Sequence, residues 1–153
     1  MGTARVLSLI FLLAGLVALP TRLTGQEAVV APCKGSTVDS YDATEAEGAR
    51  GFVAELQKLV REGDKAGIAE RVGYPLRVNR MVDGKRWHGT IRDQKQFVEE
   101  YYRLFNHGVR AAILKPDAAR CLFANDQGFM IGNGKVWFEE TAAKQFRISA
   151  LNP

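Results

Sequence analysis

The fold is decided by residues 74–88, which read YPLRVNRMVDGKRWH. Every second residue from Tyr74 to Val78 is apolar or aromatic, which is the pattern of a β-strand with one buried face. Asp83-Gly84 comes next, and this dipeptide suits the two positive φ angles of a type I′ turn. A second strand is therefore expected from Lys85 to His88, so that the stretch forms a β-hairpin.

Two helices are expected before the hairpin. Between Ala43 and Glu62, apolar residues recur at helical spacing and form one stripe. The members of this stripe are Phe52, Val53, Leu56, Leu59 and Val60. Gly63 suits the end of this helix, and Asp64 is a good cap for a short second helix over Lys65–Val72.

A long helix and then only strands are expected after the hairpin. Asp93, with Gln96 three residues later, forms a variant capping box. The apolar residues from Phe97 to Phe105 repeat the spacing of the first helix, so both helices are expected on one sheet. The four strands expected after Pro116 are Arg120–Ala124, Phe129–Ile131, Lys135–Glu139 and Phe146–Leu151.

The predicted element order is that of an α+β fold. It runs helix, helix, β-hairpin, long helix, and then three or four antiparallel strands that form a curved sheet. With the residues quoted above and with residues 128–138, GFMIGNGKVWF, this order resembles small exported bacterial proteins of uncharacterised function. These in turn are similar to the NTF2-like, or cystatin-like, α+β cone. The resemblance covers about Ala43 to Asn152.

This resemblance implies a fold more than a function. The NTF2-like superfamily includes isomerase-like and dehydratase-like enzymes, and also members that only bind ligands, dimerise or neutralise a partner. No catalytic motif of the superfamily matches this chain residue by residue, so no catalytic residue is carried over.

The N-terminal segment has the layout of a signal peptide. Val6 to Leu19 is an apolar run preceded only by Arg5 and the amino terminus. As a helix it would be about 21 Å long, short of the roughly 30 Å of a bilayer core. Cleavage after Gly25 fits best. We therefore expect a signal peptide at 1–25, a lead-in at 26–42 and one NTF2-like domain at 43–153, periplasmic or secreted, with no stable membrane anchor after cleavage.

Cys33 and Cys121 are the only two cysteines. In an oxidising compartment an even number of cysteines favours a disulfide bond. Two separate buried thiols are the alternative. Two distant cysteines without a histidine at ligand spacing predict no metal site.

The excess of basic over acidic side chains becomes smaller when the expected signal peptide is removed. The full chain has a formal charge of +4, and residues 1–25 contain two arginines and no acidic residue. The remaining excess of two positive charges is too slight and too dispersed to predict binding to nucleic acid or to anionic membranes. There is also no phosphate-binding loop, nucleophile elbow or His-Glu-x-x-His motif, which argues against nucleotide hydrolysis and metalloprotease chemistry.

His88 and His107 are the only histidines. Histidine is the commonest general base near neutral pH, and His88, at the end of the second strand, is the weak catalytic candidate. It can face either a pocket or water. His107 is expected at a helix C-terminus, where a cation suits the helix dipole.

Five other residues are candidates for ligand binding. Arg77 and Asn79 share the strand face opposite the apolar residues, where an arginine can bind a carboxylate. The others are the large side chains of Tyr101, Met130 and Trp137, which either line a cavity or fill the core.

The sequence favours an exported cell-envelope protein that binds without catalysis. Its partner would be a small apolar or anionic ligand or an envelope protein, with no cofactor and no nucleic acid. The alternative is a cavity enzyme of the isomerase, dehydratase or hydrolase type, with His88 as base and Arg77 or a tyrosine as charge partner. A structural homodimer is a third possibility. An enzyme needs at least two titratable side chains converging in a closed pocket, whereas a binding module needs few.

Overall fold

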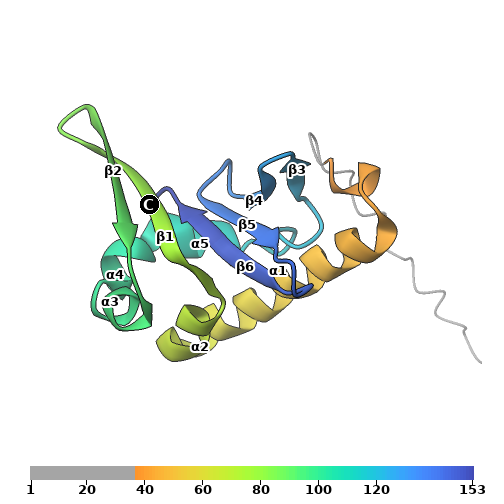
Figure 1. Ribbon diagram of the computed structural model, residues 1–153, viewed down its shortest axis with the longest axis horizontal. Coiled ribbons are helices and arrows are strands. Elements are labelled where there is room, and N and C mark those ends of the chain that lie inside the picture. Colours follow the sequence, from red (N-terminus) through yellow and green to blue (C-terminus); the bar gives the residue numbers. More distant parts are fainter. Residues whose placement is uncertain (1–36) are drawn as a thin grey trace, which may run out of the picture. The chain divides into compact units, whose positions relative to one another are not determined.

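The computed structural model describes residues 37–153 (Figure 1). The expected signal peptide, most of the lead-in and Cys33 lie outside these residues. The helices are η1 (Val38–Ser40), α1 (Ala43–Glu62), α2 (Lys65–Glu70), α3 (Gln94–Glu99), α4 (Tyr101–Leu104) and α5 (His107–Ile113). The strands are β1 (Val72–Val82), β2 (Lys85–Ile91), β3 (Phe123–Asn125), β4 (Gly128–Ile131), β5 (Val136–Glu140) and β6 (Phe146–Leu151).

Local capping sets the ends of the first two helices. Asp42 caps α1 by accepting a hydrogen bond from the Thr44 amide at 2.9 Å, and Gly63 ends it with a φ of 69°. Asp64 caps α2 through the Gly67 amide at 2.8 Å, as predicted. The second helix is shorter than expected, because Val72 belongs to β1 and pairs with β6.

The predicted long helix is divided at Glu100 into α3 and α4. Its start is confirmed, since Asp93 accepts a hydrogen bond from the Gln96 amide at 2.8 Å. The expected position of His107 at a helix C-terminus is wrong. Asn106 caps α5 through the Val109 amide at 3.0 Å, so His107 is the first residue of that helix.

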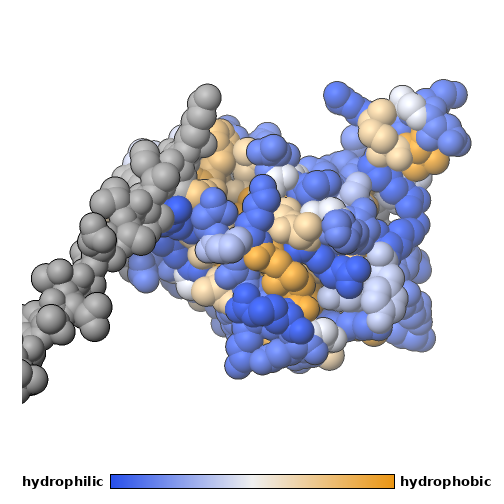
Figure 2. Space-filling model, turned by 180° about the vertical axis from the view of Figure 1, so that it is seen from behind, coloured by the Kyte–Doolittle hydropathy of each residue, from blue (hydrophilic) through white to orange (hydrophobic). Residues whose placement is uncertain are grey.

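The β-hairpin forms around the predicted turn. Asp83 and Gly84 have φ angles of 49° and 74°, which a type I′ turn requires. The pairing runs from Val82↔Lys85 to Leu76↔Ile91, so both strands are longer than predicted. The turn end of the hairpin projects from the rest of the molecule (Figures 1 and 2).

The six strands form one sheet in the order β2-β1-β6-β5-β4-β3. Four of the five pairings are antiparallel, but β1 and β6 are parallel, through Arg77↔Ala150 and Val78↔Leu151. The fold is therefore α+β with a curved mixed sheet. Four strands after Pro116, antiparallel to one another, are confirmed. The first of them was predicted over Arg120–Ala124 but is Phe123–Asn125, because residues 117–120 form turns. The parallel contact is an addition to what the sequence predicted.

The core lies between the helices and one face of the sheet. Phe52 of α1 packs against Phe138 of β5 with ring centroids 5.0 Å apart. The strand residues buried in this core are Val72, Leu76, Val78, Ile91, Ala124, Phe129, Ile131, Val136, Phe138, Ile148 and Leu151. We call the opposite side of the sheet the outer face. One row of paired residues crosses it on all six strands: Phe123, Met130, Trp137, Ala150, Arg77 and Thr90.

Candidate functional site

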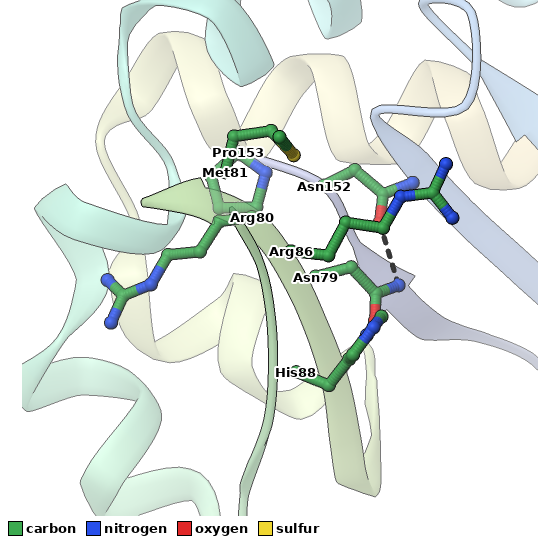
Figure 3. A pocket seen from close by; sticks show the side chains of 7 residues that line it. All are labelled: Asn79, Arg80, Met81, Arg86, His88, Asn152 and Pro153. Atoms are coloured by element: carbon green, nitrogen blue, oxygen red, sulfur yellow. Dashed lines mark hydrogen bonds between the residues drawn. The ribbon is translucent and has the colours of Figure 1, made fainter. Parts of the chain in front are cut away.

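An open pocket of about 410 Å³ lies where β6 ends and the hairpin continues. The pairing of β1 with β6 stops at Val78↔Leu151, so the rest of β1 has room on that side. The pocket is lined by Asn79, Arg80, Met81, Arg86, His88, Asn152 and Pro153 (Figure 3).

A series of side-chain hydrogen bonds runs along this pocket. His88 Nδ1 lies 2.7 Å from Asn79 Oδ1, and Asn79 Nδ2 donates to Asn152 Oδ1 at 2.9 Å (Figure 3). Asn152 Nδ2 in turn donates to the carbonyl oxygen of Gly134. The series therefore links β2, β1, the end of β6 and the turn between β4 and β5.

The direction of these bonds shows that Nδ1 of the His88 imidazole carries a proton. An amide oxygen only accepts, so His88 Nδ1 carries the proton in its bond to Asn79. When the ring is neutral, Nε2 then has the free lone pair. When the ring is protonated, Nε2–H is a second donor.

Arg86 brings a positive charge to the same pocket. It lines the pocket together with Asn79 and Asn152, and in Figure 3 its side chain extends to the same side as theirs, whereas Arg80 points to the opposite side. Arg80 instead stacks on the Trp87 ring, with its guanidinium carbon 4.2 Å from the ring centroid. Within residues 37–153, Arg86 forms no ion pair.

Apolar side chains adjoin the other end of the series. A Cβ added at Gly134 would lie 3.3 Å from Trp137 Nε1 and 3.5 Å from Met130 Sδ, with Asn152 Nδ2 at 3.8 Å. Met130 and Trp137 are paired across β4 and β5 and are half-buried. On the outer face, a pocket lined by cationic and amide side chains therefore lies next to the apolar side chains of Met130 and Trp137.

Most of the residues singled out from the sequence lie on this face. Arg77, Asn79, His88, Met130 and Trp137 are all on the outer face, by strand parity and register.

Tyr101 does not belong to this group. It is only 3% exposed and stacks on Phe105 with ring centroids 5.3 Å apart, on the helix side of the sheet. Burial raises the pKa of Tyr101.

Sequence reasoning missed Arg86 and Asn152. A signal for Arg86 was present, because a two-residue turn after Val82 pairs Arg86 with Met81 and places it on the same face as Asn79. Asn152 had no such signal. It follows the last strand, and only the parallel pairing of β6 with β1 brings it to Asn79.

Cys33 lies outside the described residues, so its disulfide with Cys121 stays a prediction. Thr37, the first of the described residues, lies close to Cys121 along the sheet edge formed by its neighbours Leu122 and Ala124. The Thr37 amide donates to the Leu122 carbonyl at 3.1 Å, and Thr37 Oγ1 accepts from the Ala124 amide at 2.7 Å.

The pocket is lined mainly by basic and amide side chains. Of the seven residues that line it, the titratable ones are Arg80, Arg86 and His88, and none carries a carboxylate, hydroxyl or thiol side chain. His88 and Arg77 are both exposed, so they do not converge in a closed pocket. Residues 37–153 contain no group of three or more His, Cys, Asp or Glu that could hold a metal ion, and no helix there is long and apolar enough to cross a membrane.

Comparisons with known proteins add no assignment. No family model matches this chain, and neither the curated proteins nor the solved structures include a match.

Proposed function

We propose that this chain is an exported, non-catalytic binding protein with an NTF2-like cone fold, and that it binds a carboxylate ligand with an apolar tail in the outer-face pocket. The observation that carries this proposal is the hydrogen-bonded series His88–Asn79–Asn152 beside the Arg86 guanidinium. It makes an ordered polar wall next to a cation that has no ion-pair partner within residues 37–153.

The donors in this pocket match a carboxylate. A guanidinium binds a carboxylate through two parallel N–H···O bonds. The amide nitrogens of Asn79 and Asn152 each have two hydrogens, and each uses one of them within the series. The second hydrogen of each amide, and Nε2–H of a protonated His88, are further donors for the ligand.

The apolar tail is suggested by Met130 and Trp137. They lie beside Gly134, where the hydrogen-bonded series ends. Small-ligand sites commonly combine an apolar lining with a few fixed polar groups, and this part of the outer face has both.

The proposals of export and of a cone rest on different features. Export is supported by the apolar run from Val6 to Leu19. The cone is supported by the element order and by a curved mixed sheet packed against helices on one face.

Calorimetric titration with phenylpropionate tests the binding proposal. We expect saturable binding to the wild type, and Arg86→Gln should weaken it about tenfold, or about 1.4 kcal/mol. Arg92→Gln is the matched control, because Arg92 is exposed and outside the pocket, and it should change the affinity by less than about twofold. Equal affinities of the wild type and Arg86→Gln would refute the proposal.

A further inference from the structure

Within residues 37–153, the outer edge of β2 pairs with no other strand. β2 is the terminal strand of the six-stranded sheet, so only one of its edges is paired. Lys85, Arg86, Trp87, His88 and Thr90 are all exposed. This edge lies on the side of the hairpin away from β6, and therefore away from the end of β6 that bounds the pocket.

The hairpin register shows which backbone groups face outward. A two-residue turn closes with a hydrogen bond between Val82 and Lys85, and bonded and non-bonded pairs then alternate along an antiparallel ladder. Lys85, Trp87 and Gly89 are therefore bonded to β1. The N–H and C=O groups of Arg86, His88 and Thr90 point away from the sheet.

The charge around this edge is strongly positive. Residues 72–92 contain five basic side chains and one acidic side chain, Asp83. The basic side chains are Arg77, Arg80, Lys85, Arg86 and Arg92. The remainder of residues 37–153 has 13 basic and 15 acidic side chains, so the basic excess is concentrated on the hairpin and not dispersed as expected.

Both faces of the hairpin carry cations and apolar groups. Arg86 and Met81 are paired on the outer face, and Met81 is 63% exposed. On the opposite face, Arg80 stacks on Trp87, whose ring occupies the place of a Cβ at Gly89. A strand added beside β2 would thus meet positive charge on either side.

We propose that the edge of β2 binds an extended acidic segment of a partner protein by strand addition. Backbone hydrogen bonds to Arg86, His88 and Thr90 would hold the segment, and its acidic side chains would pair with Lys85 and Arg86. The two proposals share the Arg86 side chain, but strand addition also needs the outward backbone groups of Arg86, His88 and Thr90, which the carboxylate pocket does not use.

Two other occupants fit the same surface less well. A second copy of this chain, paired through β2, would bring two edges with the same positive charge together, and like charges oppose edge pairing. Insertion of the hairpin end into a membrane would take the Asp83 carboxylate in first, which is unfavourable.

The test is amide hydrogen exchange with a capped peptide of about seven residues in which Glu and Val alternate. We expect the peptide to slow exchange at Arg86, His88 and Thr90, and to leave Lys85, Trp87 and Gly89 unchanged. The same peptide with every backbone nitrogen methylated, which leaves neither strand edge able to donate, and a version with Lys in place of Glu, should not bind. Lys85→Gln should weaken binding about threefold, whereas Lys58→Gln on α1 should have no effect.

Other outcomes would overturn strand addition. NMR shifts confined to the Arg86 and His88 side chains, without alternating amide protection along β2, would mean that the peptide carboxylates bind only in the pocket. That result would leave the proposed ligand site intact. Equal binding of the methylated peptide would exclude backbone pairing. Protection that rises with protein concentration in the absence of peptide would assign the edge to a second copy, and binding to anionic phosphatidylglycerol vesicles but not to the peptide would assign it to a membrane.

Discussion

Asn79 and His88 face each other across the β1–β2 ladder, and Asn79 Oδ1 lies 2.7 Å from His88 Nδ1. Asn79 is held in this orientation by its second bond, to Asn152 at 2.9 Å. The amide therefore determines which imidazole nitrogen carries the proton, and it leaves Nε2 for a ligand.

Removal of this amide should change the tautomer of His88. In the neutral ring of the wild type, we expect the proton on Nδ1. Asn79→Ala removes the acceptor, and the proton should then be shared between Nδ1 and Nε2. Nitrogen-15 NMR of the imidazole measures the two populations. His107, which is exposed on α5, is the internal control, and an unchanged His88 tautomer in the variant would contradict the assigned bond direction.

Two glycines of the α1 region should respond to alanine in opposite ways. Gly51 is in the middle of α1, and an added Cβ meets no atom within 4 Å, so Gly51→Ala should stabilise the fold by about 0.5–1 kcal/mol. Gly63 ends α1 with a φ of 69°, so Gly63→Ala should destabilise it by about 1 kcal/mol. Urea unfolding measures both changes. The same sign for both variants would contradict the observed backbone.

Alkaline pH should weaken the contribution of Tyr74. Burial, with a smaller effect from Asp93, raises the pKa of Tyr74 to about 12, above the value of about 10 in an unfolded chain. The stability from its neutral phenol, which also donates to the Ala69 carbonyl at 3.1 Å, is thus complete below about pH 10 and lost as the pH rises through about 12. The difference in unfolding free energy between the wild type and Tyr74→Phe should shrink over this range. A difference that stays constant would contradict the raised pKa.

The predicted disulfide can be tested on the purified protein. Thr37 is held against Leu122 and Ala124, and this anchors the chain close to Cys121. We expect alkylation of Cys33 and Cys121 only after reduction, as measured by intact mass. The Ser variants of either cysteine should alkylate at the remaining one without reductant. Two alkylated thiols in the unreduced wild type would show that the bond is absent.

Elements set by local chemistry were predicted well. The bounds of α1 and β6 agree with expectation to the residue, because a capped apolar stripe and a period of two are visible in short stretches of sequence. The interruption at Glu100 had no such signal, since no Gly or Pro occurs there. Glu100 instead accepts a bond from Gln96 and pairs with Arg103, contacts that the apolar spacing does not reveal.

The candidate site was predicted only in part, for a related reason. Arg77, Asn79 and His88 were recognisable from strand parity and the hairpin turn, which are local. The contact between Asn79 and Asn152 joins residues 73 positions apart and depends on the parallel pairing of β6 with β1. Tyr101 was placed among the ligand-binding residues because an aromatic at helical spacing has the same pattern in a core as in a cavity wall.

The most direct measurement is a proton–nitrogen NMR titration of the wild-type protein with phenylpropionate. The account predicts saturable shifts of the Asn79 and Asn152 side-chain amides, the Arg86 guanidinium and the Trp137 indole. Tyr101 and the other residues of the helix-side core should not shift. Shifts confined to that core, or no saturable shift at the outer face, would contradict the proposed binding site.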